Sequence, residues 1–256
     1  MSSKPTSRES KVHLAHRLAL VKLHDDIEAL EVHELDASQL AKLNIKREHM
    51  SLREDSDLKP RYFAAISNIP QPTDEVIDEA VDVEGLFEDT ISRSYHFERV
   101  WRHYGLEVRW ECNDRVWRSK PVCKYHAFKS LYKCDKPQFG VSWIMDIPGA
   151  AAPHIKVIAH SGLLVDDSKL CRGELLIILR LMICQFRMVR LLHHKVAPVL
   201  VASFMGEHAR MLESYFDGES LILRSSDLYH LSERKTTAEV FEAFAMWFAG
   251  NPAGET

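Results

Sequence analysis

The chain has 256 residues, of which 46% are hydrophobic and 27% charged, a composition typical of a protein that buries a sizeable core. Its formal net charge of −4 argues against a strongly basic nucleic-acid-binding protein. The five cysteines include no Cys-x-x-Cys pair, so we expect neither a disulfide framework nor a structural zinc site. Together with an N-terminus unlike a signal peptide, these features predict an intracellular protein, cytoplasmic or nuclear and not secreted.

The most apolar stretch of the chain, residues 175–192, does not have the pattern of a membrane span. It is interrupted by Arg180, Gln185, Arg187 and Arg190, and a charge at the centre of a bilayer is energetically costly. We therefore predict a buried helix over Glu174–His193 and no association with a membrane.

Residues 1–69 are predicted to form a charged helical arm. Apolar residues recur at helical spacing within residues 18–30, and a shorter helical pattern follows within residues 37–45. Neither pattern has enough apolar surface for a core of its own, so the arm should dock on the main domain or on a protein partner. Self-association through the arm is expected on the same grounds, and a partly disordered tail is the alternative.

A globular domain is expected over residues 70–256, after the turn-prone Ile69-Pro70-Gln71-Pro72. Its first helix is predicted over about residues 74–103, with Thr73 or Asp74 as its cap. No Lys or Arg occurs between Phe63 and Ser92, whereas acidic residues are frequent there. This helix should repel a phosphate backbone, so nucleic acid is not expected as a partner.

Strands are predicted in the middle of the chain. Leu106–Glu111 and Arg115–Arg118 alternate in polarity on either side of Asn113-Asp114, which predicts a hairpin. Residues 140–145 and 154–159 have the pattern of two further strands.

The last third of the chain has the clearest local pattern. Residues 197–224 should form a three-stranded antiparallel meander that turns at Asp217-Gly218. A closing amphipathic helix should begin at Thr236-Thr237 and stop at Gly250. Its buried face is predicted to consist of Val240, Phe241, Phe244, Trp247 and Phe248.

The predicted elements follow one another in an αβββαβ order, which resembles the core of the PD-(D/E)XK, or restriction-endonuclease-like, fold. We therefore expect an α+β protein with a mixed β-sheet flanked by helices, an N-terminal helical arm and a C-terminal amphipathic helix. The phrases Ser203-Phe-Met-Gly206, Tyr215-Phe-Asp-Gly218 and Ser226-Asp-Leu-Tyr229 also resemble a family of filamentous-fungal proteins, and that likeness implies no activity.

The resemblance to the nuclease fold implies where a catalytic site would lie. Such a site needs an acid from the first helix, an Asp at one strand and Glu-x-Lys on the next, so that carboxylates hold Mg²⁺ beside an attacking water. Asp146 follows the strand at 140–145, and Glu84 or Glu88 would be the helical acid. The next strand has His154 and Lys156 at the x-spacing but lacks the carboxylate. In this alternative Asp146 and His154 would bind the metal, although His is a poor Mg²⁺ ligand.

The leading hypothesis is therefore a non-enzymatic interaction protein built on a degenerate endonuclease-like domain, with no cofactor. The alternative is a metal-dependent nuclease that uses Mg²⁺, Asp146 and Lys156. In purely structural interpretations, Asp146 is a turn residue, Lys156 is a solvent-facing edge residue, and His193-His194 cap a helix end. A metal site formed by His154, His160 and Asp146 is the least favoured alternative.

Overall fold

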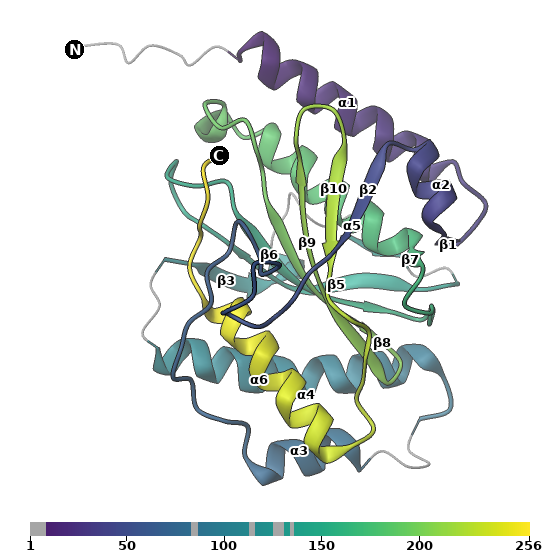
Figure 1. Ribbon diagram of the computed structural model, residues 1–256, viewed down its shortest axis with the longest axis vertical. Helices are drawn as coiled ribbons and strands as arrows, with labels where there is room; N and C mark the ends of the chain where they lie inside the picture. Colours follow the sequence, from purple (N-terminus) through teal and green to yellow (C-terminus); the bar gives the residue numbers. More distant parts are fainter. Residues whose placement is uncertain (1–8, 83–86, 113–115, 125–130, 134–135) are drawn as a thin grey trace.

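The computed structural model describes residues 9–82, 87–112, 116–124, 131–133 and 136–256. In these residues a mixed β-sheet lies between two helical layers (Figure 1). One layer contains α1 (Lys11–Glu28), α2 (Ala37–Lys42) and α5 (Arg172–Phe186), and the other contains α3 (Asp74–Val81), α4 (Thr90–Glu111) and α6 (Arg234–Ala249). The expected α+β fold, with a helix near the start and another near the end of the chain, is confirmed.

Within the described residues, the main sheet has nine strands, and its central path runs β2-β10-β9-β8-β6-β5-β3. β4 pairs with β5 and β11 with β9, while β1 (Glu34–Leu35) and β7 (Leu170–Cys171) form a separate pair. The strands of the main sheet are β2 (Ile45–His49), β3 (Arg118–Pro121), β4 (Tyr132–Lys133), β5 (Phe139–Asp146), β6 (Ile155–Ser161), β8 (Val199–Met205), β9 (His208–Phe216), β10 (Leu221–Ser225) and β11 (Tyr229–His230).

β6 and β8 are parallel neighbours at the centre of the sheet, and α5 connects them. Both strands are buried along their whole length because helices cover both faces of the sheet. The burial predicted for α5 is confirmed, and its core residues include Leu175, Ile178, Leu179, Met182 and Phe186. The helix ends at Phe186 and not at His193, because the apolar run continues in a separate 3-10 turn, η3 (Val189–Leu191), from which Leu191 enters the core.

Two hydrophobic cores fill the spaces between the sheet and the helical layers. We call them the α5-side core, which contains residues of α1 and α5, and the α4-side core, which contains residues of α4 and α6. Successive side chains of a strand point to opposite faces. In β6, Ile155, Val157 and Ala159 therefore enter the α5-side core, whereas Ile158 enters the α4-side core.

The first helix predicted for the globular domain is two helices. Thr73 caps α3, as predicted, and α4 begins only at Thr90. The predicted strand Leu106–Glu111 is wrong, because these residues are the last turns of α4. Buried residues recur there with helical spacing, at Phe97, Trp101, Tyr104 and Val108, and this period extends past the alternation on which the strand was predicted. The predicted turn Asn113-Asp114 lies outside the described residues.

The predicted three-stranded meander is confirmed. β8 and β9 pair antiparallel, and so do β9 and β10. The predicted turn follows β9, where Gly218 has a φ of 103° and the carboxylate of Asp217 accepts from the backbone N–H of Ser220 at 2.7 Å. A left-handed φ is readily adopted only by glycine, which explains the strength of the Asp-Gly signal.

The region predicted as an arm contributes to the sheet and to both cores. Leu20 and Ile27 of α1 belong to the α5-side core, and Met50 and Phe63 belong to the α4-side core. The expected helices α1 and α2 are present, but β2 was missed. β2 forms one edge of the sheet and runs parallel to β10.

The closing helix α6 has the predicted buried residues and ends at Gly250 as predicted. It begins earlier than predicted, at Arg234, and Thr237 is a buried residue inside it and not a cap. No helix in the described part of the chain combines the length and the apolar character needed to cross a bilayer.

Candidate functional site

The residues proposed from the sequence for a nuclease site do not converge. In the pairing of β5 with β6, Asp146 lies opposite Ile155, and Met145 lies opposite Lys156. Residues that lie opposite each other share a face of the sheet. Asp146 therefore faces the α5 side and Lys156 faces the α4 side, so the sheet separates the two groups.

Asp146 is a buried ion-pair partner. The Nε of Arg118 donates to its Oδ1 at 2.8 Å, a second nitrogen of Arg118 contacts Oδ2, and Arg190 lies 3.7 Å away. The turn interpretation is wrong, because Asp146 is the last residue of β5 and is fully buried. Two guanidinium groups already balance this carboxylate, which makes it a poor place for a metal cation.

Lys156 holds the end of a helix. Its Nζ donates to the carbonyl oxygens of Trp247 and Phe248 at 3.0 Å and of Gly250 at 2.5 Å, which are the last carbonyls of α6. These carbonyls have no partner within the helix and carry its negative partial charge. The ammonium group also lies 4.3 Å from the ring centre of Trp117. The interpretation of Lys156 as an exposed edge residue is therefore wrong, because β6 is a central strand.

The other candidate residues that the structure describes do not form a catalytic arrangement with Asp146 or Lys156. Glu88 is exposed in the segment before α4, and Glu84 lies outside the described residues. His154 is buried, its Nε2 lies 2.8 Å from the carbonyl oxygen of Ala253, and burial lowers its pKa to about 4. His194 bridges Ala150 and Thr256, well after the end of α5, so the predicted capping by the histidine pair is wrong.

A buried polar cluster does occur on the α4 side, and sequence reasoning missed it. The Oγ of Ser142 donates to the Oε1 of Glu98 at 2.6 Å, and Arg102 forms an ion pair with the same oxygen at 3.2 Å. The ring of His160 packs against that of Tyr95 at an interplanar angle of 35°, with a centroid separation of 4.1 Å. Burial raises the pKa of Glu98 and lowers the pKa of His160 to about 4.

This cluster lacks the ligands of a magnesium site. Glu98 is the one carboxylate of the cluster in the described part of the chain, and the strand residues that face α4 nearby are Ser142, Ile158 and His160. Mg²⁺ prefers several oxygen ligands, and Arg102 already supplies a positive charge to Glu98. One feature of the sequence indicates this buried cluster. Glu98 lies within the apolar stripe of α4, where a carboxylate must be buried.

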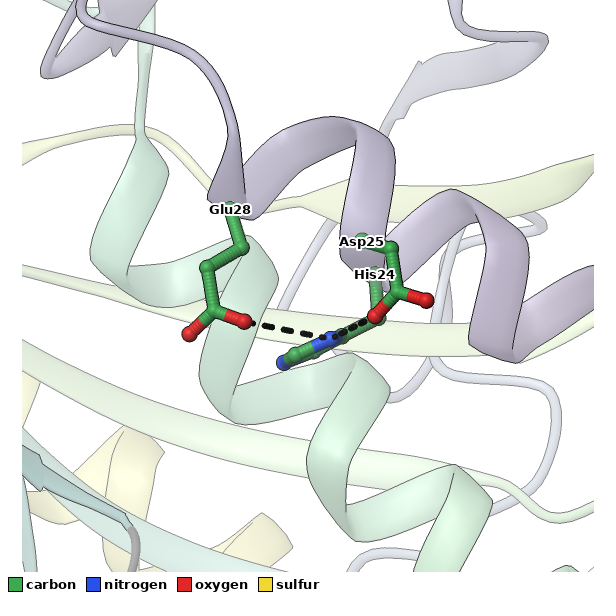
Figure 2. Close-up of side chains that lie close together, drawn as sticks. All are labelled: His24, Asp25 and Glu28. Atoms are coloured by element: carbon green, nitrogen blue, oxygen red, sulfur yellow. Dashed lines mark hydrogen bonds and ion pairs between the residues drawn. The ribbon is translucent and has the colours of Figure 1, made fainter.

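One group of donor atoms with metal-ligand spacing is found among the described residues, on α1. His24, Asp25 and Glu28 each offer an atom within 4.8 Å of the others (Figure 2). However, the Nε of Arg180 donates to the Nε2 of His24 at 3.1 Å, and its Nη2 donates to Glu28 at 2.8 Å. A guanidinium group thus contacts the other atom of two of the three ligands, and its positive charge beside them disfavours a second cation. We interpret His24 and Glu28 as part of the polar contact between α1 and α5.

The outer face of α1 has exposed apolar side chains. Leu14 and Leu18 are 38% and 54% exposed and lie one turn apart. They lie on the opposite side of the helix from Leu20 and Ile27, which contact the core. Lys11 precedes them on this face and Asp25 follows, so the apolar stripe has a positive charge at one end and a negative charge at the other.

Comparisons with protein-family models, with curated proteins and with solved structures found no match to this chain.

Proposed function

We propose that this protein is a non-enzymatic interaction protein that self-associates through the outer face of α1. The observation that carries the proposal is the exposed pair Leu14 and Leu18 between charges of opposite sign. Isolated exposed leucines are common, but two on one helical stripe form a contiguous apolar surface. α1 is also the outermost helix of its layer, so a second molecule can approach it (Figure 1).

The charge distribution selects an antiparallel arrangement of two α1 helices. With Leu18 at the centre, Leu18 meets Leu18 of the second copy, and Lys11 meets Asp25 of the second copy. The aliphatic part of Lys22 covers Leu14 of the second copy. Such an interface is isologous, because each contact occurs twice about a two-fold axis. A single helix pair buries little area, and interfaces below about 1,200 Å² are typical of weak complexes.

The polar groups of the sheet support the non-enzymatic part of the proposal. Asp146 is balanced by arginines, Lys156 is bound to helix carbonyls, and Glu98 has no second carboxylate in its cluster among the residues that the structure describes. Each of these groups has a structural role that accounts for its burial.

Sedimentation analysis over a concentration series tests the self-association. The parent protein should shift from monomer to dimer in the micromolar range, and Leu18→Glu should shift the midpoint at least tenfold higher. Leu164→Glu is the matched control, because Leu164 is 46% exposed on another surface. A parent protein that stays monomeric at several hundred micromolar would contradict the proposal.

Charge reversal tests the antiparallel register. Lys11→Glu and Asp25→Lys should each weaken the dimer, because each places like charges opposite each other. The double variant should restore association, because it recreates opposite charges in the reversed order. Double-variant association no stronger than that of either single variant would exclude this register.

The non-enzymatic part is tested separately. The purified chain is incubated with single- and double-stranded DNA and RNA in the presence of Mg²⁺ or Mn²⁺, beside Asp146→Ala and Glu98→Gln. We expect no cleavage by any of the three proteins. Metal-dependent cleavage by the parent that is lost in either variant would establish the nuclease alternative.

A further inference from the structure

Two histidines face each other across neighbouring strands at one end of the sheet. His208 begins β9 and lies opposite His230 in β11, and the centroids of the two rings are 4.6 Å apart. Opposed residues of an antiparallel pair point to the same face. The backbone N–H of Leu231 donates to the carbonyl oxygen of Glu207 at 2.7 Å, which fixes β11 to the turn before β9.

A carboxylate lies beside this pair. The Oε2 of Glu207 is 3.3 Å from the Nε2 of His230. Two ligands of a tetrahedral zinc ion, with bonds of about 2.0–2.1 Å, are also about 3.3 Å apart. The carboxylate and this imidazole are therefore already separated by the edge length of a zinc coordination shell.

The imidazole of His230 and the carboxylate of Glu207 each make a hydrogen bond through their other polar atom. The Oγ of Ser232 lies 2.8 Å from the Nδ1 of His230, and Arg93 donates to the Oε1 of Glu207 at 2.8 Å. These contacts engage the outer atom of each group and leave the Nε2 and the Oε2 facing each other. Outer contacts of this kind orient metal ligands in proteins and increase their affinity.

His208 has an unsatisfied ring nitrogen. Its Nδ1 is buried and has no hydrogen-bond partner among the described residues. The three donor atoms do not yet lie within 4.8 Å of one another, so metal binding requires the ring of His208 to turn.

We propose that Glu207, His208 and His230 form a binding site for a divalent transition-metal ion of the zinc type. Two imidazoles and one carboxylate are a zinc ligand set, and water would complete the tetrahedron. In the group on α1, Arg180 donates to the imidazole as well as to a carboxylate, whereas Arg93 contacts only the carboxylate of the proposed site. A metal at the proposed site would join β11, and with it the start of α6, to the β8–β9 turn.

The test is calorimetric titration of the tag-free, chelator-treated full chain with ZnCl₂. We expect one saturable site per chain. His208→Asn and His230→Asn should each weaken binding at least tenfold, and Ser232→Ala should weaken it by about 10-fold or more, as is usual for loss of an outer contact. Circular dichroism of each variant shows that it is folded. His24→Asn is the matched control and should leave the isotherm unchanged.

A second readout is the melting temperature. Zinc at about 100 times its Kd should raise it by about 5 °C or more in the parent, and by much less in His230→Asn. The absence of saturable zinc binding would overturn the proposal, and so would binding that persists in both histidine variants or is lost in His24→Asn.

Discussion

Lys156 is a buried ammonium group whose three hydrogen bonds hold the end of α6 against the sheet. Lys156→Met keeps most of the aliphatic volume but removes the donor to the carbonyls of Trp247 and Phe248, whereas the carbonyl of Gly250 keeps the Nε1 of Trp117 as a donor. A buried carbonyl without a donor costs about 1–3 kcal/mol, so we expect the free energy of unfolding to fall by at least about 2 kcal/mol. Urea denaturation at pH 7 measures it. The control Lys235→Met, at an exposed position of α6, should change stability by less than about 0.5 kcal/mol.

The burial of the His160 imidazole should lower the stability of the folded chain by an amount that can be measured. Neither ring nitrogen has a hydrogen-bond partner among the described residues, and a buried polar group without a partner costs about 1–3 kcal/mol. His160→Phe preserves the aromatic contact with Tyr95 and should therefore stabilise the protein by about 1 kcal/mol at pH 7.

The gain from His160→Phe should depend on pH. The pKa of His160 is about 4 in the folded chain and ordinarily near 6.5, so between these values only the unfolded chain binds the proton. The parent therefore loses stability as the pH falls from 6.5 towards 4, and the gain should grow by roughly 2 kcal/mol at pH 5. Denaturant unfolding of the parent and of His160→Phe at pH 7 and pH 5 measures this change in the stability gain, with His103→Phe as a control at an exposed position. A gain that is equal at both pH values would show that the imidazole is not kept neutral by the fold.

At the scale of elements, α5 is the buried link between the two parallel central strands. Leu179 is fully buried in the α5-side core. Leu179→Asp places a charge there without a partner, which costs several kcal/mol and exceeds a large part of the total stability of a typical domain. We expect the variant to be insoluble on expression, whereas Leu164→Asp on an exposed loop should remain soluble. A soluble Leu179→Asp variant with a normal melting temperature would show that α5 is peripheral.

The elements that could be predicted from the sequence are those with strong local periodicity. α5, the β8–β10 meander and α6 are of this kind, because their apolar spacing and their turn glycine are local signals. β2 could not be predicted, because four of its five residues are polar and its pairing partner is distant in sequence. The end of α4 was predicted wrongly because a short alternating run outweighed the longer helical period.

The candidate site was harder to predict than the fold. The partners of Lys156 lie 91 to 94 residues away, and nothing in its neighbouring residues marks it as buried. Asp146 and Lys156 have a plausible spacing in sequence, but the register of β5 with β6 places them on opposite faces. His208 and His230 have no motif spacing, and only the pairing of β9 with β11 brings them together.

At the scale of the whole molecule, residues before position 70 are part of both cores. Leu20 and Ile45 contribute to one core, and Met50 and Phe63 to the other. A fragment of residues 70–256 would expose the opposing surfaces of both cores and the edge of β10. We therefore expect it to be insoluble, or to bind a hydrophobic dye without a cooperative melting transition. A chain of residues 9–256 is the control and should melt like the full protein. A cooperative transition of the shorter fragment would show that residues 70–256 fold independently.

The parallel pairing of β2 with β10 has a consequence for the synthesis of the chain. Asn44, just before β2, contacts Ser220, just before β10, and the two residues are 176 positions apart. At about 5–20 residues per second, a ribosome needs on the order of 10–35 s to make the intervening chain. During this interval β2 lacks the strand with which it pairs in the folded chain. The final packing of the sheet therefore waits until almost the entire chain has emerged, and chaperones that bind unfinished chains have their longest opportunity at the N-terminal segment.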